Sequence, residues 1–176
     1  TRRRAPRPAP NPAVRKKPEL SLRARALQYL ARREYSRAEL RGKLLPYTGE
    51  DGDPNQPQPE NLDVLLDDLT ARGWLSDARA ATQLLHAKRG RFGIQRITQE
   101  LRRKGIAEEL IGDALPGLKE SELDTARSVW QRKFGTLPQD DKEKARQVRF
   151  LQSRGFGFDV ILRVLRQPAS GEEESS

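Results

Sequence analysis

The chain has 176 residues, a net charge of +9, no cysteine and one histidine. Disulfides, thiolate catalysis and cysteine zinc sites are therefore excluded. Hydrophobic residues make up 35% of the chain and charged residues 34%, a balance that argues against one large core and favours several small helical cores in a row.

The first 18 residues combine five prolines with seven cations and no acid. Such a segment has almost nothing to bury, so we predict a disordered basic tail over residues 1–18. A run of positive charge of this kind is either a solvated tail or a segment that binds a polyanion, and the sequence leaves both interpretations open. Methionine is absent, so we expect the natural start to lie outside this sequence.

A helix start is marked at Ser36, because Glu39 follows three residues later and completes a capping box. Tyr35 and Leu40 stand where a hydrophobic staple would pack. The helix is therefore predicted to begin at Arg37. Residues 46–59, rich in proline and glycine, are predicted to form a loop. A second, weaker start of the same kind combines Asp140 with Glu143.

Three helix ends share one pattern, in which a leucine is followed by a cation, a glycine and an apolar residue. The three runs are Leu69-Arg72-Gly73-Trp74, Leu101-Lys104-Gly105-Ile106 and Leu151-Arg154-Gly155-Phe156. The glycine suits a left-handed residue, the cation faces the negative end of the helix dipole, and the leucine can meet the apolar residue across a Schellman turn. We predict helices that end at these glycines, and no strand between residues 20 and 167.

The chain repeats itself with a shift of 50 residues. The matching positions are Leu101, Gly105, Ile106, Leu110, Ile111, Ala114 and Leu115 against Leu151, Gly155, Phe156, Val160, Ile161, Val164 and Leu165. A weaker copy lies earlier. We predict an all-α fold of three tandem three-helix units that form an elongated, curved body. The units are 20–75, which contains the 46–59 loop, 76–117 and 119–167. Within the second unit, helices over 95–104 and 107–115 are predicted to be joined by a tight turn. Residues 168–176 are predicted to be a disordered acidic tail.

Basic side chains are the candidate partner contacts. They are Arg32, Arg33 and Arg37 in the first unit, Lys88, Arg89, Arg91, Arg96, Arg102, Arg103 and Lys104 in the second, and Arg132, Lys133, Arg149 and Arg154 in the third. Arg41, Arg146, Arg163 and Arg166 are further cations of the same kind. The run 88–104 holds seven cations and one acid, which favours a phosphate-rich or acidic partner over a merely solvated helix surface. Arg96 and Arg103, seven residues apart, are predicted to share one open helix face.

Catalytic chemistry finds no support among the remaining polar residues. The stretch from Gly90 to Gly93 is too short for a phosphate loop. The adjacent acids Asp67-Asp68 and Asp140-Asp141 point apart on a helix, and Ser36 is explained by its capping role. His86 is interpreted as a surface residue. We therefore expect no enzyme activity, no cofactor and no metal.

Aromatic side chains are interpreted as core residues. This prediction covers Trp74, Trp130 and Phe156. Phe92 lies inside the basic run and is either a core residue or a partner contact, and the sequence favours the core.

Four stretches resemble the RecX family of RecA recombinase regulators and occur in the family's order. They run from Ala26 to Leu40, from Arg72 to Arg79, from Arg89 through Ile97 to Ile106, and from Arg149 through Phe156 to Ile161. The resemblance covers about residues 20–167. It departs from the family pattern at Ile94, where proline is common, at Ala80 and Ala81, where an aromatic is common nearby, and in the longer 46–59 loop.

The resemblance implies three tandem three-helix repeats that bind the filament of RecA, single-stranded DNA and ATP. A RecX-like protein would lie in the filament's helical groove, bridge neighbouring subunits and block extension, ATP hydrolysis, strand exchange and co-protease action. It also implies a cytoplasmic monomer, with no membrane partner, that serves DNA repair and the SOS response. Weak direct contact with DNA is a further expectation. The alternative function is a direct DNA-binding protein built from helix-turn-helix-like units.

Overall fold

The computed structural model describes residues 20–48 and 62–166, and every regular element in those ranges is helical, as predicted. The elements are α1 (Leu22–Leu30), α2 (Arg37–Leu44), the short 3₁₀ helix η1 (Leu45–Tyr47), α3 (Leu62–Ala71), α4 (Asp77–Lys88), α5 (Ile94–Arg103), α6 (Glu108–Lys133), α7 (Asp141–Ser153) and α8 (Phe158–Arg166). The predicted disordered tails 1–18 and 168–176 lie outside the described residues. So does most of the predicted loop, whose first two residues belong to η1 instead.

The predicted helix starts are confirmed. Ser36 accepts a hydrogen bond from the Glu39 amide, and the Glu39 carboxylate accepts one from the Ser36 amide, which completes the capping box of α2. Tyr35 and Leu40 are both buried in the same hydrophobic cluster. At α7 the Asp140 side chain accepts from the Glu143 amide at 2.7 Å.

The three predicted helix ends are also confirmed. Gly73, Gly105 and Gly155 have φ of 71°, 72° and 84°, the left-handed region that a side chain disfavours. In each turn the glycine amide donates to the carbonyl three residues earlier at 2.9 Å, and the next amide donates to the carbonyl of the leucine at 2.9 to 3.3 Å. These two bonds define a Schellman turn, so each chain reversal is set by local sequence.

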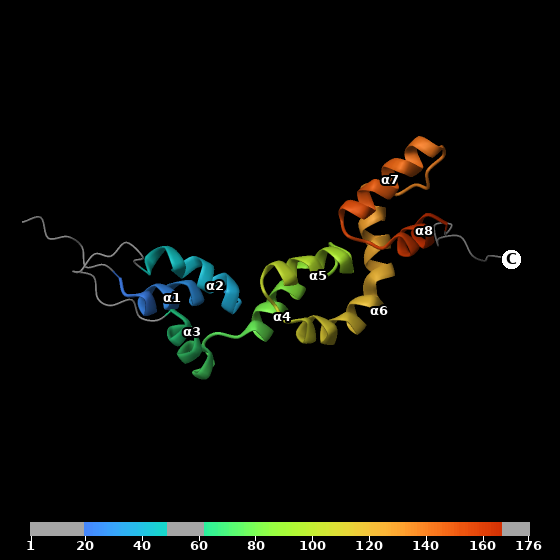
Figure 1. Ribbon diagram of the computed structural model, residues 1–176. Coiled ribbons are helices and arrows are strands. Elements are labelled where there is room, and N and C mark those ends of the chain that lie inside the picture. Colours follow the sequence, from blue (N-terminus) through green and yellow to red (C-terminus); the bar gives the residue numbers. More distant parts are fainter. Residues whose placement is uncertain (1–19, 49–61, 167–176) are drawn as a thin grey trace, which may run out of the picture.

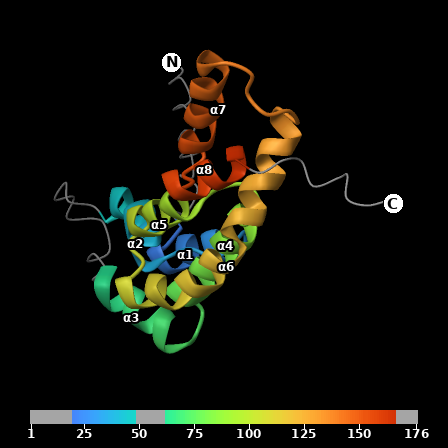
Figure 2. The ribbon, with the colours of Figure 1, turned by 90° about the vertical axis from the view of Figure 1, so that its right-hand side faces the viewer.

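Three hydrophobic clusters follow one another along the chain. The first includes Leu40, Leu66 and Leu69, the second Ile97, Leu101 and Ile111, and the third Leu151, Phe156 and Ile161. Figure 1 shows the corresponding helix groups in a row rather than packed into a sphere, with α1 to α3 at one end and α7 and α8 at the other. Figure 2 looks along this row, with the helix groups behind one another. The body is therefore elongated and curved.

One long helix joins the second and third clusters. The sequence predicted a helix that ends near residue 115 and a unit boundary at 117–119, but α6 continues from Glu108 to Lys133 with Pro116 inside it. Leu118 packs in the second cluster and Ala126 in the third. Figure 1 shows α6 changing direction between its yellow and its orange part, as a missing proline amide allows. The unit boundaries themselves remain a prediction.

Among the aromatic residues, Trp74 differs from the prediction, and Phe92 packs against the core only in part. Trp74 is 45% exposed, because Leu75 beside it occupies the buried position of the first cluster and donates its amide to the Leu69 carbonyl. Phe92 is only half-buried against the second cluster. Trp130 and Phe156 are buried as predicted, and the Trp130 indole donates to Gln147 at 2.7 Å.

Candidate partner-binding surface

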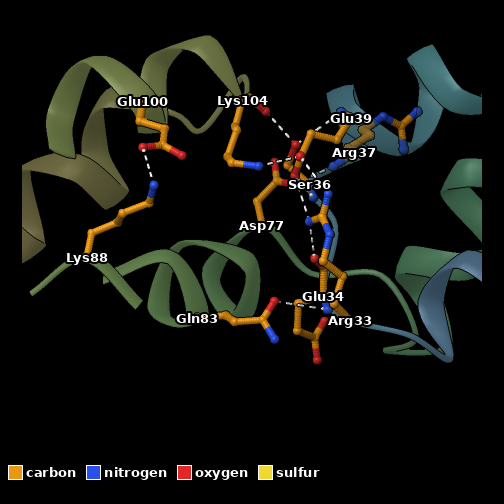
Figure 3. Close-up of polar contacts among 10 residues, drawn as sticks. All are labelled: Arg33, Glu34, Ser36, Arg37, Glu39, Asp77, Gln83, Lys88, Glu100 and Lys104. Atoms are coloured by element: carbon orange, nitrogen blue, oxygen red, sulfur yellow. Dashed lines mark hydrogen bonds and ion pairs between the residues drawn. The ribbon is translucent and has the colours of Figure 1, made fainter. Parts of the chain in front are cut away.

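The end of α5 meets the start of α2, and we call this contact the first joint (Figure 3). The Ser36 hydroxyl donates to the Lys104 carbonyl, and the Lys104 ammonium pairs with the Glu39 carboxylate. The Asp77 carboxylate, from the start of α4, accepts from the Arg37 amide at 2.7 Å. The first joint therefore covers the free amides at the start of α2 with polar groups of the next helices.

The charge of Glu39 is held by its neighbours in the first joint. Burial alone would raise the pKa of this carboxyl, but hydrogen bonds from Arg33 and Lys104 outweigh burial and lower the pKa below its ordinary value. Arg33 lies 3.1 Å from Glu39. Glu39 is therefore a charged centre that ties α2 to the end of α5.

The same arrangement recurs where the turn between α7 and α8 meets the start of α5, and we call this the second joint. The Gly93 amide donates to the Arg154 carbonyl at 2.9 Å, and the Gln95 amide to the Gly155 carbonyl at 3.2 Å. Any Cβ at Gly93 would collide with the backbone of Gly155. The Glu122 carboxylate of α6 caps the Ile94 amide at 3.0 Å, as Asp77 caps Arg37. The starts of α2 and α5 are therefore each capped by a carboxylate from a helix that follows in the chain.

Five of the predicted partner contacts are neutralised within the protein. The pairs are Arg33–Glu39 at 3.1 Å, Arg37–Asp67 at 2.8 Å, Lys88–Glu100 at 3.2 Å, Arg102–Glu108 at 2.7 Å and Lys104–Glu39. Figure 3 shows the Lys88–Glu100 pair apart from the cluster of the first joint. Because four carboxylates already offset most of the charge of these five cations, with Glu39 shared by Arg33 and Lys104, the five offer less attraction to an outside anion than the sequence suggested.

The other nine predicted contacts form no ion pair with an acid of residues 20–48 or 62–166. They are Arg32, Arg89, Arg91, Arg96, Arg103, Arg132, Lys133, Arg149 and Arg154. Except for Arg32, they lie on α5, α7, the end of α6 and the turns of the second joint. The structure therefore brings together cations from the second and third units around the second joint.

Two hollows flank the second joint. The larger, of about 800 Å³, lies between α5 and the end of α7 and is lined by Arg96 and Arg103. Both side chains are exposed, but the Arg96 guanidinium also donates to the Ser153 carbonyl at 2.8 Å. The smaller, of about 270 Å³, is lined by Arg91, Arg132, Lys133, Arg154, Val129 and Phe150. We call it the basic pocket.

Several basic side chains lie close to the ring of Phe92. The guanidinium of Arg96 lies 4.5 Å from the ring centroid and that of Arg154 5.5 Å, while the Lys88 ammonium lies 5.2 Å from it. Such cation–π contacts hold basic groups close together without cancelling their charge. Phe92 thus organises the cations of the second joint rather than serving only as core.

Sequence reasoning missed the residues that complete these surfaces. Gln95, Gln99 and Gln152 line the larger hollow with Ser153, and Glu122 and Gly93 build the second joint. The only available signal was the glycine at position 93, which was considered only as part of a phosphate loop and not as a close backbone contact. Among the described residues no group of three metal-binding side chains occurs. No helix there is long and apolar enough to cross a membrane.

Comparisons with known proteins agree with this architecture. Residues 76–115 match the family model "RecX, second three-helix domain", and residues 120–165 match "RecX, third three-helix domain". The chain is 49% identical over 150 residues to the "Regulatory protein RecX" of Leptothrix cholodnii, covering 85% of this chain and 90% of that protein. It is 44% identical over 145 residues to the protein of the same name from Chromobacterium violaceum, covering 82% and 89%.

Solved structures share the fold at lower identity. A crystal structure of RecX from Lactobacillus salivarius aligns with a TM-score of 0.63 and 16% identity, covering 82% of this chain and 92% of that one. A crystal structure of a regulatory protein RecX aligns with a TM-score of 0.66 and 22% identity, covering 83% and 72%. With the two family models and the relatives of more than 40% identity, it follows that this chain belongs to the RecX family of regulatory proteins.

Proposed function

We propose that this chain binds the filament of RecA, single-stranded DNA and ATP, and limits filament extension, ATP hydrolysis, strand exchange and co-protease action. Membership of a family of regulatory proteins supports the regulatory role. The elongated row of helix groups supports a binding mode in the filament's helical groove, because an extended body can contact more than one subunit.

The observation that carries this proposal is the group of unneutralised cations around the second joint. A nucleoprotein filament presents phosphates and acidic protein surface together, and both attract such a group. The cations come from two helix groups that are held by backbone hydrogen bonds, so their spacing is fixed before a partner arrives. Binding then loses little conformational entropy in the joint.

The chain acts in this proposal by occupancy, as a cytoplasmic monomer without catalysis of its own. Recombination, DNA repair and the SOS response are the processes that such a regulator would restrain. We therefore expect the purified protein to show no ATP hydrolysis or nuclease activity of its own. Such an activity, if a point variant of this chain abolished it, would contradict this expectation.

The experiment compares naked single-stranded DNA with DNA coated by RecA and ATP. We expect the full chain to bind the coated DNA at least tenfold more tightly and to slow DNA-dependent ATP hydrolysis by RecA in proportion to occupancy. RecA without DNA serves as the control for a contact with free subunits. Equal affinity for naked and coated DNA, with ATP hydrolysis unaffected, would instead favour a direct DNA-binding protein.

A further inference from the structure

The basic pocket concentrates positive charge from three separate parts of the chain. Arg91 comes from the turn after α4, Arg132 and Lys133 from the end of α6, and Arg154 from the end of α7. The other lining residues, Val129 and Phe150, carry no charge. Among the residues that the structure describes, no carboxylate lines this hollow of about 270 Å³. Four like charges around one cavity repel one another, and an anion in the cavity relieves that repulsion.

Neutral partners hold two of the three arginines of the pocket in place. The Arg132 guanidinium donates to the carbonyls of Ser128 and Gly90, each at 3.1 Å. The Arg154 guanidinium lies 5.2 Å from the Phe150 ring centroid. These contacts fix the planar groups but leave their charge uncancelled. The pocket is therefore preorganised for an anion rather than collapsed onto internal acids.

A structural role at helix ends explains only some of the four cations of the basic pocket. Arg132 and Lys133 lie in the last turn of α6, where cations favour the helix dipole. Arg91 belongs to no helix, and its place in the pocket needs another reason. The Arg154 carbonyl is already bonded to the Gly93 amide, so the end of α7 does not need a further partner there.

A nucleic-acid strand fits the pocket better than a single protein carboxylate. A backbone phosphate and a carboxylate each bring one charge and two free oxygens, but a strand carries a further phosphate at the next nucleotide, so neighbouring phosphates can share the four cations. Guanidinium groups bind phosphate oxygens in bidentate geometry. We propose that the basic pocket binds backbone phosphate of a nucleic-acid strand. The proposal rests on the proposed function only in taking the filament's DNA as that strand.

The test measures binding of the full chain to a naked oligothymidylate by fluorescence anisotropy over a range of salt concentrations. The variant Arg91→Gln with Lys133→Gln removes two pocket charges whose side chains make no hydrogen bond within the described residues. The matched control, Arg163→Gln with Arg166→Gln, removes two charges of α8 outside the pocket. Thermal melts establish that both variants fold.

We expect the pocket variant to bind the oligonucleotide about tenfold more weakly, and the slope of log affinity against log salt to fall by about 1.4, which corresponds to two lost phosphate contacts on a single strand. The control should change affinity by less than about twofold. Equal losses in both variants would assign binding to diffuse charge and overturn the proposal. Absence of oligonucleotide binding by the parent would overturn it as well.

Two further measurements separate other anions from a strand. If the pocket variant binds naked DNA normally but binds RecA-coated DNA weakly, the pocket holds acidic protein surface; the phosphate proposal fails and the proposed function stands. If micromolar pyrophosphate displaces the oligonucleotide, the pocket holds a small polyphosphate and the strand is excluded. If the pocket variant loses binding to naked DNA but still inhibits RecA normally, the phosphate site in the pocket is supported. Its contact with phosphate is then not required for inhibition.

Discussion

At the scale of single residues, the three Schellman glycines have the same backbone but different surroundings. A Cβ at Gly73 would meet nothing within 4 Å, whereas one at Gly105 would collide with the Ala38 side chain in the first joint. Gly73→Ala should therefore cost only the left-handed strain of about 1 kcal/mol. Gly105→Ala should cost about 1 to 3 kcal/mol more, because overpacking is added. Free energies of unfolding in urea measure both.

Gly42→Ala serves as the control for this pair. It lies inside α2 with open space around it, so the change should stabilise the protein by up to about 1 kcal/mol through helix propensity. Equal losses at positions 73 and 105 would show that the first joint tolerates a side chain.

Two carboxyls of the joints have pKa values shifted in opposite directions. Burial, aided by the negative charge of Asp159, raises the pKa of Glu122 despite the bond from the Ile94 amide, whereas the pKa of Glu39 is lowered. The contribution of Glu39 to stability is present above the ordinary carboxyl pKa and lost as pH falls through its folded value. The contribution of Glu122 is present below the ordinary pKa and lost as pH rises through its folded value.

Glu39→Gln should therefore destabilise the protein at pH 7, by about 1 to 2 kcal/mol for charged hydrogen bonds at a partly exposed group. Glu122→Gln keeps an acceptor oxygen for the Ile94 amide and removes the unfavourable charge, so it should stabilise at pH 7. Both differences from the parent should shrink towards acidic pH. Urea unfolding at pH 7 and at about pH 4 measures them, and differences of the same sign at pH 7 would contradict the assignment.

The predicted open face of α5 holds two arginines with different surroundings. Arg103 is exposed in the larger hollow, whereas Arg96 donates to the Ser153 carbonyl and lies against Phe92. Arg103→Ala should weaken binding to RecA-coated DNA several-fold without changing Tm, while Arg96→Ala should also lower Tm by several degrees through the second joint. Arg163→Ala is the charge control, and an effect of Arg103→Ala no larger than that of the control would show a merely solvated face.

Residue-level sequence reasoning succeeded where the physics is local. The capping box and the Schellman turns involve residues within six positions of one another, so their hydrogen bonds follow from the sequence alone. The pairing of Lys104 with Glu39 spans 65 positions, and no local pattern contains it. For that reason Lys104 was predicted to be a partner contact, and so was Arg37, whose acid partner is also distant in sequence. Arg33 and Arg102 pair with acids only six positions away, but across the turn before or after a helix rather than within a helical repeat.

At the scale of elements, α6 shows how tertiary packing can extend a helix past the end that the repeat predicts. The sequence predicted a helix that stops just before Pro116, but packing of Leu118 and Ala126 in separate clusters carries the helix through it. Burial on both sides of the proline outweighs the lost backbone hydrogen bond. Tertiary packing of this kind cannot be inferred from local propensity.

Pro116→Ala should restore that hydrogen bond and straighten α6, and so raise helicity in far-UV circular dichroism. It should not lower stability, since proline inside a helix costs about 3 kcal/mol relative to alanine. Inhibition of RecA ATP hydrolysis should nevertheless fall, because the third cluster would point in another direction. Gly112→Ala, which raises helix propensity without removing the bend, is the control. Full inhibition by Pro116→Ala would show that the direction of α6 is unimportant.

At the scale of the whole molecule, two joints and one shared helix couple three small cores. The 50-residue repeat predicted the row of cores, because each copy carries its own buried positions. It did not predict the joints, which depend on backbone contacts between segments distant in sequence. Stability in such a row is the sum of the cores and their contacts, so a broken joint should uncouple its neighbours.

The two tryptophans can report this uncoupling. Trp130 lies in the third cluster and Trp74 in the first unit, so Trp74→Phe leaves fluorescence that tracks the third cluster alone. In that background Gly93→Ala should break the second joint, and Trp130 should then unfold at lower urea than the far-UV circular dichroism signal. The two signals should stay together in Gly42→Ala. Coincident transitions in Gly93→Ala would show that α6 alone couples the clusters.

The length of α6 also sets the direction in which the third cluster points relative to the second. Each residue added to an α-helix rotates the segment beyond it by about 100° and moves that segment by about 1.5 Å. One residue inserted between Leu118 and Ala126 would swing the third cluster, with every lining residue of the basic pocket except Arg91, to another side of the molecule. Seven inserted residues would restore its direction to within about 20° but would move it by about 10 Å, far enough to separate the Gly93 amide from the Arg154 carbonyl and break the second joint. The second joint therefore fixes the length of this helix as well as its direction.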